Sequence, residues 1–299
     1  MLLRQAKQNV SSRIVQVRGA AVGMVRLRAC RARVQNSCLH VKGYHAMSES
    51  SDDEIQGLRA ATIEDMLRER RDLLLSRIDE ALQTHGRSAD DVRVMAVSKT
   101  VDAQTVACAY RVGYRLFGEN RPQELRRKTE VLADLILAQK ISFHMIGNLQ
   151  SNKINMVLGH VDLIHSISSY ALAQKISEHA CARSVVQDVL LEANVSGEAS
   201  KSGFSKDELL LHLDELAALE GIRLVGLMTM APAGSRERAR SCFEALRLLR
   251  DECEVRTGLS LPELSCGMSG DFEEAIAEGS TLIRLGRIVF DPDYPLAFA

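Results

Sequence analysis

Lys99 is the residue whose type and position point most directly to covalent chemistry. It follows the apolar run Val92–Val97, and a lysine at the end of a buried strand must reach solvent, pair with an acid or react. Burial favours the neutral amine, which attacks a carbonyl carbon to form a Schiff base. A lysine on the rim that bonds a neighbouring carboxylate fits the same position, so Lys99 alone leaves both interpretations open.

Polar residues follow the next apolar runs in a similar way. They are Glu119 and Asn120 after the run that ends at Phe117, and His144, Asn148, Ser151 and Asn152 in and after the run that starts at Phe143. Each also has a structural explanation, because a buried histidine is usually part of the core and asparagine or serine often caps a helix.

The last two apolar runs end in small residues that suit an anion. Ser269 and Gly270 can offer a hydroxyl and an unobstructed amide, and Gly286 lets the backbone approach an anion closely. In α/β barrels the loops after strands seven and eight commonly bind phosphate. A lysine on the first strand together with such loops indicates a phosphorylated aldehyde, and pyridoxal phosphate is the obvious candidate. Ser269 and Asp271 could also simply cap a helix.

These positions require a fold that brings the ends of many apolar runs together. The runs are Val92–Val97, Leu116–Phe117, Phe143–Ile146, Leu163–Ile167, Val186–Val195, Leu224–Met230, Leu264–Met268 and Leu282–Phe290. The helical stretches between them are Ala103–Val112, Gln123–Leu137, Ala171–Ala182, Lys206–Leu219, Arg236–Arg256 and Phe272–Glu278. Strands that alternate with helices predict a parallel sheet, and eight such units in about 200 residues predict a single closed (β/α)8 TIM-type barrel.

The predicted barrel domain covers residues 53–299 and begins with a helix from Asp53 to about His85, which Gly86 ends. An open, doubly wound sheet is the alternative architecture. It needs a crevice at a switch point, and no G-x-G-x-x-G follows any of the runs.

Residues 1–47 have a different composition from the rest of the chain. They hold seven Arg and two Lys and no acidic residue, so they carry +9 of the net charge of −1 and leave −10 for the remainder. An Arg-rich segment without acids is typical of a transit peptide, which predicts a mitochondrial protein with a cleaved or disordered leader. Translation from Met47 is the alternative, and it predicts a cytoplasmic protein.

The remaining composition argues against several classes of partner. An acidic body with 4% aromatic residues and no Trp does not suit nucleic acid. No stretch approaches the roughly 18 apolar residues of a membrane span. The seven cysteines show neither C-x-x-C spacing nor a histidine cluster, so we interpret them as reduced thiols and expect no metal.

Eight strings in these segments together resemble the pyridoxal phosphate homeostasis protein family, also called proline synthetase co-transcribed-like proteins. The strings are AVSKT, FGEN with QEL just after, HMIGNLQSNK, HSISS, SGEASKSGF, GLMTMAP, LSCGMSGDFEEAI and EGSTLIRLG, and they cover about residues 90–290 in order. The resemblance implies a barrel related to the N-terminal domain of alanine racemase. It also implies that pyridoxal phosphate is the cofactor.

The resemblance also implies roles for individual residues at the ring of the cofactor. Lys99 would form the internal aldimine, Asn120 would lie beside the ring, and Arg284 would face the pyridine nitrogen. A cation there keeps the nitrogen unprotonated and weakens the ring as an electron sink. Met228 and His144 would line the floor of the site.

At the phosphate end, the resemblance assigns Ser269 and the backbone at Gly286 and Arg287. Three residues depart from the family pattern: Arg121 stands where an aromatic residue is usual, Arg287 where Thr or Ser is usual, and Asp291 where glycine is usual. Arg287 still supplies an amide but no hydroxyl, so we expect the affinity for the cofactor to be altered.

A carrier is the expected function, because a racemase needs a second acid–base group opposite the lysine. Only nine residues follow Phe290, and the sequence shows no clear second base. We therefore expect a monomer that stores pyridoxal phosphate and delivers it to apoenzymes, and that is not an enzyme. A racemase-like enzyme with weak one-base activity is one alternative. A Schiff-base aldolase that uses Lys99 without a cofactor is another.

Overall fold

The computed structural model describes residues 42–198 and 201–296, with side chains described from residue 57 onward. The chain divides into two compact units, 1–49 and 50–299. Of the first unit only the beginning of helix α1 (Lys42–Thr84) is described, and the rest of the predicted leader lies outside the described residues. The second unit contains the predicted barrel domain.

Eight parallel strands form a closed barrel in sequence order, and β1 pairs with β8 to complete it. The strands are β1 (Arg93–Val97), β2 (Leu116–Glu119), β3 (Ser142–Met145), β4 (Leu163–Ile167), β5 (Gln187–Glu192), β6 (Ile222–Met228), β7 (Glu263–Ser265) and β8 (Leu282–Leu285). The predicted fold class is therefore confirmed. Every strand ends at the same face, so the residues that follow the strands are brought together.

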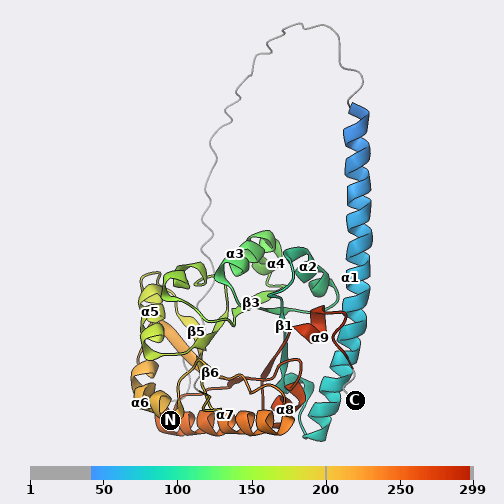
Figure 1. The fold of residues 1–299 in the computed structure, drawn as a ribbon. Coiled ribbons are helices and arrows are strands. Elements are labelled where there is room, and N and C mark those ends of the chain that lie inside the picture. Colours follow the sequence, from blue (N-terminus) through green and yellow to red (C-terminus); the bar gives the residue numbers. More distant parts are fainter. Residues whose placement is uncertain (1–41, 199–200, 297–299) are drawn as a thin grey trace, which may run out of the picture. The chain divides into compact units, whose positions relative to one another are not determined.

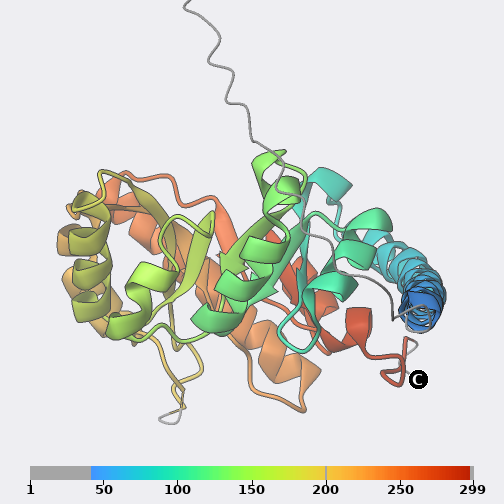
Figure 2. The same ribbon diagram turned by 90° about the horizontal axis from the view of Figure 1, so that it is seen from above.

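Helices surround the barrel, and α5 and α6 pack against each other at one side (Figures 1 and 2). The helices after α1 are α2 (Ala103–Arg111), α3 (Pro122–Val131), α4 (Ala133–Leu137), α5 (Tyr170–Cys181), α6 (Lys206–Ala217), α7 (Arg236–Thr257), α8 (Phe272–Ala277) and α9 (Arg287–Phe290). Short 3-10 helices are η1 (Ala89–Asp91) and η2 (Ser151–Met156). The first helix begins earlier than predicted: we expected it to start at Asp53, and α1 already includes Lys42.

Two predicted elements differ in detail from the structure. The expected helix Gln123–Leu137 is broken at Leu132, whose φ of −101° and ψ of 18° leave the helical region. The expected strand Leu282–Phe290 ends at Leu285. Beyond it the carbonyl of Gly286 accepts the amides of Val289 and Phe290, which starts α9 in place of a longer strand.

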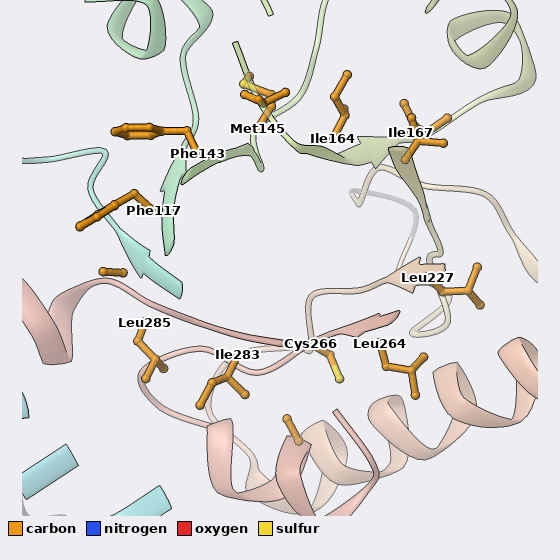
Figure 3. Packing of buried hydrophobic residues seen from close by; sticks show 14 of the residues in the cluster. Phe117, Phe143, Met145, Ile164, Ile167, Leu227, Leu264, Cys266, Ile283 and Leu285 are labelled. Carbon is orange, nitrogen blue, oxygen red and sulfur yellow. The ribbon is translucent and has the colours of Figure 1, made fainter. Parts of the chain in front are cut away.

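The main core lies between the strands and the surrounding helices. Phe117, Ile164, Leu227 and Ile283 point outward from the strands into this layer (Figure 3) and are fully buried. Each such side chain contributes about 1.5–3 kcal/mol of transfer free energy. The inside of the barrel holds only small apolar clusters, which leaves room there for polar side chains.

Among the described residues, no helix is long and apolar enough to cross a membrane. The same part of the chain contains no cluster of metal-ligating side chains. The five cysteines described there are free thiols.

Candidate functional site

A cavity of about 910 Å³ opens at the face where the strands end. The residues around it come from the ends of seven strands and from the loops that follow them. They include Lys99, Asn120, Asn148, Glu192, Met228, Ser269, Arg284, Gly286 and Arg287. Seven of the eight residues predicted to bind a cofactor therefore line a single cavity.

Lys99 lies on the cavity wall, and its side chain is exposed. The expectation that burial activates this amine is therefore not met in the structure, because the cavity is open to water around it.

Asn120, at the end of the neighbouring strand, is fixed by close backbone packing: a Cβ on Gly147 would lie 2.2 Å from the carbonyl oxygen of Asn120. Glycine at position 147 allows these two loops to touch.

Arg284 is a buried cation at the bottom of the cavity, only 5% exposed. Its Nη1 donates to Ser265 Oγ at 2.8 Å, and its Nη2 donates to the carbonyl oxygen of Thr229 at 2.9 Å. No carboxylate of the described residues forms an ion pair with it, and burial lowers the pKa of the guanidinium. A buried charge without a counterion is costly unless polar groups solvate it.

Two histidines extend this polar contact through the inside of the barrel. His165 Nδ1 lies 2.9 Å from Ser265 Oγ, and His165 Nε2 lies 2.9 Å from His144 Nδ1. Arg284 can only donate, so Ser265 Oγ accepts from it, and a hydroxyl can donate to His165 Nδ1 at the same time. With its Nε2 protonated, His165 donates to His144 Nδ1. In this tautomer the dipoles of Ser265, His165 and His144 all point their negative ends toward the guanidinium.

Both histidines are neutral in the folded protein. Burial lowers the pKa of His144 from 6.5 to about 3, and burial and the adjacent His144 hold the pKa of His165 well below its ordinary value. His144 does not reach the cavity wall, in contrast to the predicted floor residue Met228. The structure places His144 behind the site, as the second member of the chain that solvates Arg284.

The phosphate-type loops after β7 and β8 are joined by Ser269. Its Oγ is buried and accepts the amide of Ile288 at 3.2 Å, which leaves the hydroxyl proton for another acceptor. A Cβ on Gly270 would have no neighbour closer than 3.8 Å, and one on Gly286 none closer than 3.5 Å. A side chain at either position would thus meet ordinary van der Waals contacts, and both glycines line the cavity. The cavity beside these glycines and the Ser269 hydroxyl suit an anion.

Of the departures, Arg287 lines the cavity, whereas Asp291 follows α9 and is not part of the cavity wall. The guanidinium of Arg287 is exposed and stacks on Tyr294 at 4.9 Å from the ring centroid. Asp271, which follows the cradle, accepts the amide of Met268 at 2.6 Å. Asp271 occupies the N-cap position of α8, as the alternative explanation expected, but its side chain binds the Met268 amide and makes no cap hydrogen bond to the helix.

Glu192 is a cavity residue that the sequence analysis missed. It is the last residue of β5, directly across the barrel from β1, and pairs in register with Met228. Its carboxyl group is buried, and burial raises its pKa although Arg284 opposes this. The rule that found Lys99 and Asn120 did not select Glu192, because Glu192 lies inside the predicted run Val186–Val195, whereas β5 ends at Glu192 in the structure.

The donors present fit pyridoxal phosphate. An accessible primary amine, a buried cation and an open anion cradle lie on one cavity, at the ends of β1, β8 and the β7 loop. The cavity volume of about 910 Å³ is ample for a ligand of this size.

Comparison with known proteins agrees with this arrangement. Residues 72–292 match the family model described as the alanine racemase N-terminal domain. A pyridoxal phosphate homeostasis protein of Aquifex aeolicus is 40% identical over 223 residues, which are 74% of this chain and 96% of the relative. The Escherichia coli K12 protein of the same name is 37% identical, over 72% of this chain and 91% of the relative. This chain belongs to the pyridoxal phosphate homeostasis protein family.

Several solved structures are similar to the barrel of this chain. A protein of unknown function from Bifidobacterium adolescentis is 41% identical with a TM-score of 0.71, over 78% of this chain and 96% of that one. PipY of Synechococcus elongatus, solved with pyridoxal phosphate bound, is 33% identical with a TM-score of 0.66, over 75% and 99%. Alanine racemase of Clostridium difficile shares the fold, at 16% identity and a TM-score of 0.59 over 77% of this chain and 57% of the enzyme.

The buried histidine pair predicts a specific loss of stability in acid. Folding lowers the pKa of His144 from 6.5 to about 3, so the unfolded state takes up protons first as the pH falls. The stability from the neutral ring is complete above pH 6.5 and declines toward pH 3. Between pH 7 and pH 5, His144→Gln should lose about 2 kcal/mol less stability than the wild type in urea unfolding.

The exposed His160→Gln variant is the matched control, and it should lose as much stability as the wild type. An equal acid-induced loss in His144→Gln and the wild type would show that the folded protein does not hold His144 neutral.

Proposed function

We propose that this chain holds pyridoxal phosphate as a Schiff base on Lys99 and delivers it to apoenzymes, as a factor of pyridoxal phosphate homeostasis. One observation carries the proposal: the amine of Lys99, the buried Arg284 and the Ser269 cradle line the same cavity. The names of the relatives and the ligand of PipY support the same cofactor.

Each of these residues has a distinct task in the proposal. When bound, pyridoxal phosphate supplies an aldehyde that condenses reversibly with a primary amine and releases water. Lys99 provides that amine, and Ser269 donates its hydroxyl proton to the phosphate. Arg284 would donate to the ring nitrogen, and because a guanidinium gives up no proton, a ring bound there would remain a poor electron sink. Weak electron withdrawal favours storage over reaction.

The exposure of Lys99 supports delivery to other proteins. An amine from an apoenzyme must reach the carbon bonded to Lys99, and the side chain lies where solvent already has access. Met230 and Met268 are also exposed at the mouth, so the rim offers flexible apolar contacts. A closed site would protect a reactive intermediate, whereas an open one permits exchange.

Lys99→Ala tests the central claim. After borohydride reduction, peptide mapping of the wild type should find a pyridoxyl group on Lys99, and the variant should carry none. The loaded wild type should also reactivate an apo-transaminase, which the variant should fail to do. Lys201→Ala, which removes an amine held at the mouth by Glu198 and the Met230 carbonyl, is the control and should behave as the wild type.

An adduct on a lysine other than Lys99 would contradict the proposal. A wild-type protein that stays colourless with added pyridoxal phosphate would instead favour a Schiff-base aldolase.

Glu192 favours a second candidate, a racemase-like enzyme with weak activity. Two-sided proton exchange needs an acid–base group opposite the lysine, and Glu192 is a buried carboxyl on the opposite strand. Burial raises its pKa toward the range of a useful acid. The structure thus contains a candidate for the group that the sequence analysis found missing.

Deuterium exchange at the α-carbon of amino acids separates the two candidates. For a carrier, the loaded wild type and Glu192→Gln should both exchange no faster than free pyridoxal phosphate in heavy water. Rapid exchange that Glu192→Gln slows by about tenfold or more, with unchanged cofactor affinity, would establish the enzyme.

We further propose that the protein is a mitochondrial monomer. The acid-free segment 1–47 with its charge of +9 supports import. Mitochondrial protein that lacks most of the acid-free segment 1–47 should be found by mass spectrometry after fractionation. Full-length protein confined to the cytosol would contradict import, and a dimer in sedimentation would contradict the monomer.

A further inference from the structure

Lys128 is a buried charge that the proposed site does not use. It lies on α3 with 0% exposure, and its ammonium contacts two acceptors. Nζ donates to the carbonyl oxygen of Ser98 at 2.7 Å and to Glu119 Oε1 at 2.5 Å. Neither Lys128 nor these two partners line the cavity.

Stability alone is a weak explanation for this ion pair. Removing two charges from water is costly, and well-packed apolar residues of similar volume often stabilise a fold as well or better. Glu119 Oε2 is also buried without a hydrogen-bond partner, which adds to the cost. The location of the ion pair is more informative. Ser98 and Glu119, the two acceptors of Lys128, directly precede the cavity residues Lys99 and Asn120 in the chain.

The first partner fixes the backbone that leads to Lys99. Ser98 donates its amide to the carbonyl of Gly118 at 3.0 Å and its hydroxyl to Glu119 Oε1 at 2.7 Å, while its own carbonyl accepts from Lys128. Every polar group of Ser98 is therefore held. The Cα atom of Lys99 lies one rigid peptide unit beyond that carbonyl.

The second partner fixes the backbone that leads to Asn120. The carbonyl of Glu119 accepts the amide of Ile146 at 2.9 Å, and its side chain binds Lys128 and Ser98. Asn120 then presses on Gly147, as described above. A single ammonium thus connects the ends of β1 and β2 just behind the two residues that enter the cavity.

We propose that Lys128 is a positioning residue, which together with Glu119 holds the backbone from which Lys99 and Asn120 reach the cofactor. This inference rests on the proposed function. It predicts that the pair controls the affinity and the orientation of bound pyridoxal phosphate, beyond any effect on folding.

The test compares Lys128→Met with the double variant Lys128→Met/Glu119→Gln. The single variant leaves the Glu119 carboxylate buried without its partner, so it should melt well below the wild type. The double variant removes both charges and should recover most of that loss in melting temperature. Because the carbonyl of Ser98 loses the Lys128 ammonium and keeps only the amide of Val101, the double variant should bind pyridoxal phosphate about tenfold more weakly or worse.

Induced circular dichroism of the bound cofactor reports the orientation of the cofactor in its site and does not depend on the stability of the fold. We expect a smaller or shifted band in the double variant, saturated with pyridoxal phosphate, than in the wild type. Leu213→Ala is the control, because it opens a cavity under α6 and lowers the melting temperature. It should keep the wild-type affinity and dichroism.

A double variant that folds and shows wild-type affinity and dichroism would overturn the positioning role of Lys128. Failure of the proposed function has a different signature, since the wild type itself would then show no pyridoxyl group on Lys99.

Discussion

The unpaired guanidinium of Arg284 is the constraint to which the inside of the barrel is adjusted. A charge that is buried and has no carboxylate partner must be solvated by dipoles. Ser265, His165 and the carbonyl of Thr229 supply these dipoles. His144 contacts the other nitrogen of His165 and so fixes the orientation of that ring. This arrangement requires neutral histidines, and burial favours the neutral form because it lowers the pKa values of His144 and His165. The cation is thereby held ready for an acceptor in the cavity.

The fold followed from the sequence because the strand signal is strong in a parallel barrel. Each strand faces helices on one side and other strands' side chains on the other, so the end of β6, Leu224–Met228, is a nearly continuous apolar run. The ends of the elements were harder to predict. Leu282–Phe290 is apolar apart from Arg284, Gly286 and Arg287, and the backbone at Gly286 decides that the strand stops and a turn of helix begins.

The cavity wall was predictable for a related reason, and the residues behind it were not. A position at the end of a strand can be read from the sequence, which is how Lys99, Asn120 and Ser269 were found. Lys128 lies in the middle of a charged helix segment, where its neighbours Arg126 and Arg127 form ordinary exposed ion pairs. Nothing in that pattern distinguishes the one lysine that turns inward. Its partner at Ser98 is 30 residues away, so the contact exists only in three dimensions.

The two buried cations act on the site in complementary ways. Arg284 meets the cavity directly and has no carboxylate partner, so its charge is available to a bound ligand. Lys128 is neutralised by Glu119 behind the wall, so its charge stays away from the ligand and only its hydrogen bonds matter. The side chain of Lys99 is exposed on the cavity wall, where water can reach it. Backbone that is fixed just before Lys99, together with an accessible Lys99 side chain, supports the proposal that the protein holds an aldehyde and releases it to another amine. An enzyme that must protect a carbanion needs the opposite arrangement, with the reacting atoms closed off from solvent.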